Sequence, residues 1–319
     1  MCYSQQVSQD FHRLMRTFGA KLSTKEFLAL YQRRQRGERV LIPKGMDEAF
    51  LASSDPSLGE IRDLIRGHLA CESTRLEELL FAQRTRLVDA ERKLAVKFTK
   101  GATESKRIAG DKIEDAKIKL ADLRRREPKM RDSRIYPSSY ALVMVVEDGE
   151  RKIMPMRYLC RPAGKPASYD ERYPGTYNAR RNSLNGYWKG LWGHSHGLIL
   201  STAFFEHVKQ HRKEGRELEP GEKEVDMVLE FRPQPEQEMF VACLWSRWTA
   251  PGEPDLLSFA AITDEPPPEV EAAGHDRCII PIDPANVDAW LNPDSRLLEQ
   301  QEAILDERER PYYEHRLAA

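Results

Sequence analysis

Between residues 57 and 126, apolar side chains recur every three, four or seven positions, and charged residues fill the positions between them. This spacing is typical of amphipathic helices, in which such residues share one face. A bend is expected near Lys100 and Gly101 or at Gly110. The pattern therefore predicts two long helices arranged as an antiparallel hairpin, similar to a coiled coil. A capping box that starts at Ser23 predicts a further short helix.

After Pro128 the pattern changes to short apolar segments separated by turns. Residues 140–146 and 152–158 flank Asp148 and Gly149, a sequence typical of a β-hairpin. Further strands are expected at 197–202, 224–231, 239–244 and 257–263, and helices at 204–213 and 284–291. Consecutive hairpins with few helices between them predict an α+β fold with a mixed, mostly antiparallel β core, into which the helical hairpin is inserted.

Composition limits the classes of function. The chain has 319 residues and a net charge of -1, so any binding to nucleic acid must come from a local patch. No segment is apolar enough for a membrane span or a signal peptide, which predicts a cytoplasmic protein without a membrane partner. The cysteines are odd in number and scattered, which predicts reduced thiols and neither a disulfide framework nor a zinc site; they are Cys2, Cys71, Cys160, Cys243 and Cys278. We expect no cofactor.

The segment Gly-His-Ser-His-Gly at 193–197 matches the nucleophile elbow of α/β hydrolases. Asp264 and His275 would complete a triad with Ser195 in the expected chain order. The flanking sequence disagrees, because the elbow should open a helix whereas residues 198–202 are predicted to form a strand. His194 and His196 have no carboxylate or third histidine nearby to complete a metal site. A serine hydrolase remains the weaker alternative.

The chain begins Met-Cys-Tyr-Ser. Removal of Met1 would leave Cys2 with a free α-amine next to its thiol, and a 1,2-aminothiol is a specialised nucleophile. An exposed cysteine on a frayed terminus is the simpler interpretation unless other residues supply partners.

Four segments in chain order resemble the SRAP family (SOS response-associated peptidase): Cys2, Tyr-Asn-Ala-Arg at 177–180, Ala-Phe-Phe-Glu at 203–206 and His-Asp-Arg at 275–277. The segments at 155–162, 198–200, 240–248, 258–263 and 288–291 are similar to further family motifs in the same order. The resemblance implies an SRAP-like core built from residues 1–10 and 135–296. Residues 11–134 would then be a helical insertion, and residues 297–319 a charged C-terminal helix or tail.

The resemblance implies covalent capture of abasic sites in single-stranded or junction DNA. The α-amine of Cys2 would form a Schiff base with the sugar aldehyde, and the thiol would close a thiazolidine ring. Family resemblance also implies that the protein removes Met1 itself, as an autoproteolytic cysteine peptidase with crosslinking and lyase-like activity. Such a protein would act in DNA repair during the SOS response and would associate with the nucleoid in a bacterium.

The family resemblance also implies roles for individual residues. Asn178 would orient the Cys2 amine, Glu206 would be the general acid and base, and His275 would move protons. DNA contacts would come from Arg180, Arg277, Arg157, Tyr158 and Pro137, with the arginines suited to phosphates.

The sequence departs from the family pattern at two places. Cys2 is followed by Tyr3 and Ser4 where the family usually has glycine and arginine, and His207 stands where a tryptophan commonly follows the glutamate. These departures keep a second hypothesis open, a non-catalytic DNA-repair scaffold. Its helical hairpin would bind a protein partner or a second copy of the chain.

Overall fold

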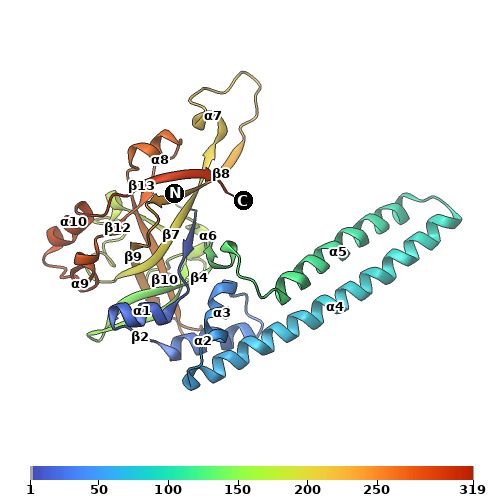
Figure 1. The fold of residues 1–319 in the computed structure, drawn as a ribbon, viewed down its shortest axis with the longest axis horizontal. Helices are drawn as coiled ribbons and strands as arrows, with labels where there is room; N and C mark the ends of the chain where they lie inside the picture. Colours follow the sequence, from blue (N-terminus) through green and yellow to red (C-terminus); the bar gives the residue numbers. More distant parts are fainter. Residues whose placement is uncertain (1–2, 319) are drawn as a thin grey trace. The chain divides into compact units, whose positions relative to one another are not determined.

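A computed structural model describes residues 3–318, and Met1, Cys2 and Ala319 lie outside the described residues. The chain divides into two compact units, which are described separately (Figure 1). The first unit comprises residues 1–30, 39–52 and 130–319, and the second comprises residues 31–38 and 53–129. None of the helices within residues 3–318 has the length and apolar character needed to span a bilayer.

A β-sheet forms the centre of the first unit. Its strands within residues 3–318 are β1 (Ser4–Val7), β2 (Lys21–Leu22), β3 (Arg134–Ile135), β4 (Tyr140–Glu147), β5 (Glu150–Tyr158), β6 (Asn178–Arg180), β7 (His196–Lys209), β8 (Asp226–Gln234), β9 (Met239–Trp248), β10 (Leu256–Asp264), β11 (Cys278–Ile279), β12 (Pro281–Ile282) and β13 (Tyr312–Leu317). Strands β4, β5, β10, β9 and β7 pair in a closed ring in which only the β5–β10 pair is parallel. The predicted mixed, mostly antiparallel α+β core is therefore confirmed.

The interior of this ring is filled by apolar side chains from alternate positions of its strands. They include Val143, Val145, Met154, Met156, Ile199, Val241, Cys243, Phe259 and Ala261, each at most 1% exposed. The β4–β5 hairpin turns at Asp148 and Gly149, both with positive φ as a tight hairpin turn requires.

Strand β7 is longer than the sequence predicts. Its first part, residues 196–201, pairs with β9 and β4, and its second part pairs with β1 and β8. The prediction of a helix at 204–213 is therefore wrong, because only α7 (Gln210–Lys213) is helical. Phe204 and Phe205 are both buried, on opposite faces of the strand, which removes the alternation that marks an ordinary strand.

Helices and the C-terminal segment surround the sheet. The other α-helices of the first unit are α1 (Phe11–Phe18), α3 (Lys44–Ala52), α6 (Tyr169–Arg172), α8 (Pro268–Ala272), α9 (Val287–Leu291) and α10 (Leu298–Asp306), with 3-10 turns η2 (Met130–Ser133), η3 (Arg181–Ser183) and η4 (Pro284–Asn286). Helix α2 (Thr24–Gln35) begins in the first unit and ends in the second, and the 3-10 turn η1 (Pro56–Leu58) belongs to the second unit. The expected charged tail is more ordered than the sequence indicates, because α10 is followed by β13, which pairs with β8.

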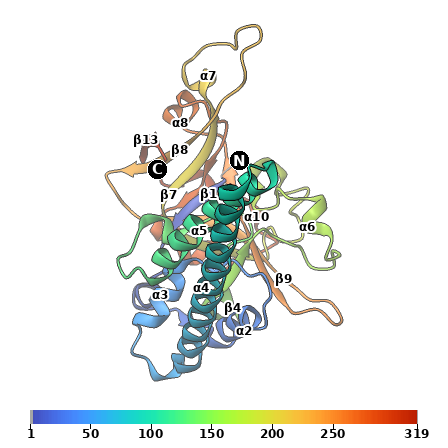
Figure 2. The same cartoon turned by 90° about the vertical axis from the view of Figure 1, so that its right-hand side faces the viewer.

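The second unit contains the predicted helical hairpin, with α4 (Gly59–Val96) and α5 (Lys100–Arg124) running antiparallel (Figure 2). The break lies at residues 97–99, where the Thr99 side chain accepts a hydrogen bond from Ala102 N at 3.2 Å and caps α5. Gly110 lies inside α5 and makes no bend. The helices pack through small and aliphatic residues: Leu76, Ala90, Ala102, Ala109, Ile113, Ala116 and Leu120.

Gly197 provides a test of the closed ring. A Cβ atom at this position would lie 3.1 Å from Cys243 Sγ and 3.1 Å from Val143 Cγ1, and both neighbours are fully buried. Overpacking should make Gly197→Ala less stable by about 1–3 kcal/mol. Chemical denaturation should show this loss, whereas Gly190→Ala, with no neighbour within 4 Å, should unfold close to wild type. Equal stability of Gly197→Ala and wild type would contradict this packing.

Candidate active site

Glu206 and His275 form a buried pair inside the first unit. Glu206 lies in β7 and is 0% exposed, and its Oε2 lies 3.2 Å from Nε2 of His275, which is 8% exposed. The loop that carries His275 comes close to β7 because Gly274 has φ +92°, and a Cβ there would lie 2.9 Å from Val208 Cγ1. An ionised carboxylate without water contact is costly, so a proton or a compensating partner is required here.

The pair can hold one proton or two, because the contact of 3.2 Å between Nε2 and Oε2 brings complementary atoms together in both states. His275 Nδ1 lies 2.9 Å from the Arg277 carbonyl oxygen, to which it can donate, and 3.3 Å from the Arg277 backbone nitrogen, which can donate to it. With Nδ1 protonated, Nε2 accepts from a Glu206 carboxylic acid; with Nε2 protonated, it donates to a Glu206 carboxylate. The pair can therefore give up or take a proton, as general acid–base chemistry requires.

Asn178 is positioned by a chain of hydrogen bonds that starts at β1. The Tyr158 hydroxyl donates to Asn178 Oδ1 at 3.3 Å, and Gln5 Nε2 donates to the Tyr158 hydroxyl at 3.5 Å. Tyr158 is 0% exposed and its ring stacks on Phe259. Tyr158, which the sequence interpretation made a DNA contact, therefore has no exposed surface and contacts Asn178 instead.

The beginning of the described chain lies beside Glu206. Ser4 is opposite Phe205 in the β1–β7 pair, so the residue before β1 is adjacent to the segment that carries Glu206. The ring of Tyr3 packs edge-on against His207, with ring centroids 4.5 Å apart. Cys2, the predicted nucleophile, lies outside the described residues, one peptide bond before Tyr3.

Arg134 is a residue that the sequence analysis missed. Its Nε and Nη2 donate to Ser4 Oγ at 3.0 and 2.9 Å, and its guanidinium lies 3.5 Å from the centre of the Phe205 ring. Arg134 therefore places a cation next to β1. It lies in the short strand β3, whose sequence does not indicate that its arginine contacts β1. Only the contact with Ser4, which is distant in the sequence, reveals it.

The predicted DNA-binding arginines lie in different surroundings. Arg180 is exposed at the end of β6, and Arg277 lines an open depression of about 510 Å³ together with His275. Arg157, in contrast, forms an ion pair with Asp170 at 2.7 Å and is largely buried. Pro137 is half-buried in the turn before β4. The depression also contains three acidic residues, Glu265, Glu271 and Asp276.

The serine-hydrolase alternative is contradicted by the geometry. Ser195 leads directly into strand β7 and opens no helix. Asp264 is bound to Arg181 and Arg308, and His275 faces Glu206, so no triad forms around Ser195. His196 is a core residue, stacked on Trp290 with its Nδ1 3.2 Å from the Trp290 carbonyl oxygen.

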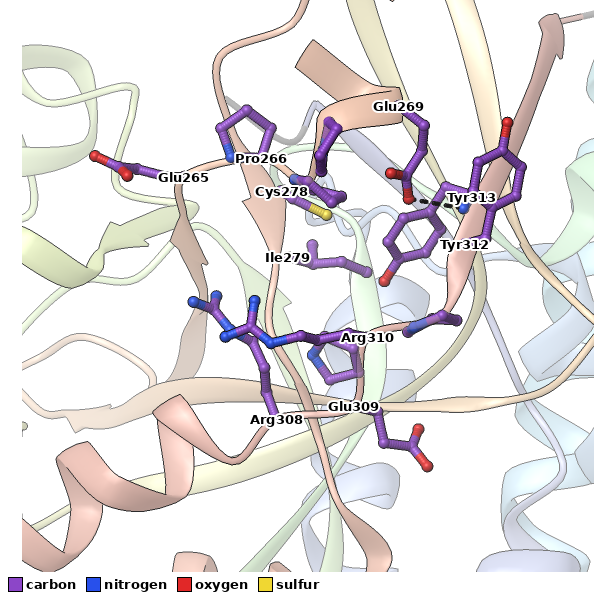
Figure 3. Close-up of a pocket in the computed structure, with 14 residues that line it drawn as sticks. Glu265, Pro266, Glu269, Cys278, Ile279, Arg308, Glu309, Arg310, Tyr312 and Tyr313 are labelled. Carbon is purple, nitrogen blue, oxygen red and sulfur yellow. Dashed lines mark hydrogen bonds between the residues drawn. The ribbon is translucent and has the colours of Figure 1, made fainter. Parts of the chain in front are cut away.

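A second cavity, of about 400 Å³, lies between α8, β11 and the segment before β13 (Figure 3). Its wall is rich in proline and tyrosine, and its charged residues are Glu265, Glu269, Glu309, Arg308 and Arg310. Burial and then the charge of Glu206 raise the pKa of the Cys278 thiol on this wall, which keeps the thiol protonated. The mixed charges give the cavity no net preference for an anion.

Comparisons with known proteins give one family. The family model described as SOS response associated peptidase (SRAP) matches residues 101–317. Solved structures similar to this chain include a protein from Bordetella bronchiseptica, with 16% identity, a TM-score of 0.46 and coverage of 59% of this chain and 87% of that chain. A protein from Bacteroides thetaiotaomicron has 14% identity, a TM-score of 0.46 and coverage of 59% and 78%. A phage-related protein from Bordetella bronchiseptica has 17% identity and a TM-score of 0.43, and the match covers 63% of this chain and 88% of that chain. No curated protein matches the chain.

Burial of His275 should make stability depend on pH. Burial lowers the pKa of His275 to about 4, whereas an unfolded histidine has a pKa of about 6.5. Between these values the unfolded chain binds the extra proton, so the free energy of unfolding should fall as pH is lowered from about 6.5 to 4. His196, whose pKa burial lowers to about 3, should contribute in the same direction.

Denaturation of wild type and His275→Gln across this range measures the contribution. The wild-type curve should be steeper than that of the variant by up to about 1.4 kcal/mol per pH unit, the value of one proton. Above about pH 7.5 the two curves should run parallel, which serves as the internal control. Parallel curves throughout would show that His275 is not held neutral.

Proposed function

The chain belongs to the SOS response associated peptidase (SRAP) family, and we propose on this basis that it captures abasic sites in single-stranded or junction DNA as covalent adducts of Cys2. The observation that carries the proposal is the buried Glu206–His275 pair, beside which the described chain begins. An acid–base pair next to an N-terminal 1,2-aminothiol suits the reaction of an amine with an aldehyde.

Each chemical step has a proton that the pair can move. The α-amine of Cys2 attacks the aldehyde carbon of the opened sugar and forms a C–N bond. Loss of the resulting hydroxyl as water requires a proton, which the Glu206–His275 pair donates; the remaining proton on nitrogen returns to the pair, and the product is a neutral imine. The Cys2 sulfur then adds to the imine carbon while the thiol proton passes to nitrogen, which closes a thiazolidine ring. One water molecule is released overall.

The remaining residues would position the reactants. Asn178, held by the Tyr158 hydroxyl, would orient the Cys2 amine. Arg277 lies in the same depression as His275 and would bind a phosphate next to the lesion, and Arg180 would bind another. Before capture, the same acid–base pair would assist hydrolysis of the Met1–Cys2 peptide bond.

The departures from the family pattern have structural counterparts in this chain. Ser4 stands where the family usually has arginine, and the guanidinium of Arg134 is hydrogen-bonded to Ser4 Oγ. His207 stands where a tryptophan is common, and it packs against Tyr3, the other departing residue. Both changes are therefore accommodated locally and are compatible with the pairing of β1 beside Glu206.

A crosslinking experiment tests the role of Cys2. Protein with Met1 removed is incubated with an oligonucleotide that contains one abasic site and is analysed under denaturing conditions. Wild type and Cys71→Ala, in which an exposed cysteine is removed, should both form an adduct, and Cys2→Ala should form none. Cys2→Ser keeps the amine without the thiol, so its adduct should survive denaturation only after borohydride reduction of the imine. Equal adduct yields from wild type and Cys2→Ala would disprove the proposal.

A kinetic experiment tests the acid–base pair. Glu206→Gln and His275→Gln should slow adduct formation by about 10²–10⁴-fold, the usual contribution of general acid–base catalysis. Glu299→Gln, on the exposed face of α10, is the matched control and should react at the wild-type rate. Rates are read from quenched time courses over a range of pH, after thermal melting has shown that each variant is folded. Wild-type rates for both pair variants would exclude these residues from the chemistry.

A further inference from the structure

Positive charge is concentrated at one end of the α4–α5 hairpin. Residues 84–107, here called the hairpin tip, contain eight lysines and arginines and three acidic residues, a net charge of +5. The rest of the hairpin, residues 59–83 and 108–126, contains nine basic and nine acidic residues and is neutral. Because the whole chain carries -1, the tip is a local positive patch on an otherwise acidic protein.

Ion pairs neutralise the three acidic residues of the tip, Asp89, Glu91 and Glu104, and leave the excess of cations there unmatched. In the neutral part, Arg66, Arg75, Lys117 and Lys119 each pair with an acidic residue three or four positions away. Four exposed cations of the tip form no ion pair within residues 3–318: Arg84, Lys93, Lys97 and Lys100. The charge of the tip is therefore available to an external anion.

The tip also exposes apolar and polar groups suited to a nucleic acid. Phe98, between Lys97 and Lys100, is 73% exposed, and an exposed aromatic ring next to cations is a typical stacking site for a base. A cleft of about 620 Å³ between the two helices is lined by two cationic, three hydroxyl and one acidic side chain: Arg86, Lys93, Thr85, Thr99, Ser105 and Asp89. The cationic and hydroxyl groups can donate hydrogen bonds to phosphate oxygens.

We propose that the hairpin tip binds the phosphate backbone of DNA and that Phe98 stacks on an unpaired base, as a contact additional to the Glu206 site. A second copy of the chain fits less well as the occupant, because two tips of charge +5 repel each other. The negative charge on the remainder of the chain is diffuse and largely ion-paired, whereas duplex DNA carries one charge per ~1.7 Å of its axis. DNA is therefore the stronger electrostatic partner.

Salt-dependent binding to an undamaged single-stranded oligonucleotide tests this proposal. The tip variant Lys93→Gln, Lys97→Gln, Lys100→Gln is compared with a matched control in α5, Lys112→Gln, Lys117→Gln, Lys119→Gln. Loss of up to three phosphate contacts should reduce the slope of log K against log salt by about 2, at about 0.7 per contact. The control should keep the wild-type slope, because its lysines lie outside the tip and Lys117 and Lys119 are already paired with Glu114 and Asp115. Helical content from circular dichroism confirms that both variants are folded.

Phe98→Ala provides a second measurement. It should weaken binding to single strands by about 5–150-fold, the equivalent of 1–3 kcal/mol of stacking, and leave the salt slope unchanged. Equal slopes for the tip variant and the control would overturn the proposal. So would sedimentation that shows wild-type self-association lost only in the tip variant, since a second copy would then be the occupant. Because the oligonucleotide is undamaged, these results do not depend on crosslinking by Cys2.

Discussion

The backbone pairing of β7 is the constraint on which the rest of the first unit depends. Its first part closes the ring of strands with β4 and β9, and its second part holds β1 and β8. A shift of one residue would move every side chain of β7 to the opposite face, so the packed ring fixes the register of the whole strand. Glu206 lies in β7, and β1 pairs with the same strand. The pairing that forms the core therefore also places the first described residues beside the buried carboxyl group.

Local patterns predicted the long helices and the β4–β5 hairpin. The helices follow from the repeat that one buried face produces. The strand β4 is buried on both faces and was predicted instead from a short apolar segment that ends at the turn of Asp148 and Gly149. The prediction failed at 204–213 because burial on both faces gives residues 203–206 no alternation. The prediction of Asn178, Glu206 and His275 as catalytic residues came from the family resemblance alone. Neither periodicity nor composition indicates that a glutamate in an apolar strand and a loop histidine are 3.2 Å apart.

Contacts between residues distant in sequence explain what a single sequence could not. Tyr3 and His207 are separate departures from the family pattern in the sequence, and the fold brings their rings together. Likewise Ser4 lacks the expected cationic side chain, and Arg134 donates to it from another strand. Each pair is understood only when the register of β1 against β7 and β3 is known. Contacts between strands therefore hold the first described residues, Tyr3 and Ser4, in place.

Helix stability alone does not account for the hairpin tip. A helix N-terminus favours negative charge by about 0.3–1 kcal/mol, yet α5 begins at Lys100 and has no acidic residue in its first turn. Elsewhere in the hairpin, cations are matched to carboxylates three or four positions away, so the chain can neutralise charge in this way. Leaving Lys93, Lys97 and Lys100 without a carboxylate partner costs little helix stability at each position, but the three positions lie within one short segment. A binding partner with high negative charge density gives this arrangement a physical reason.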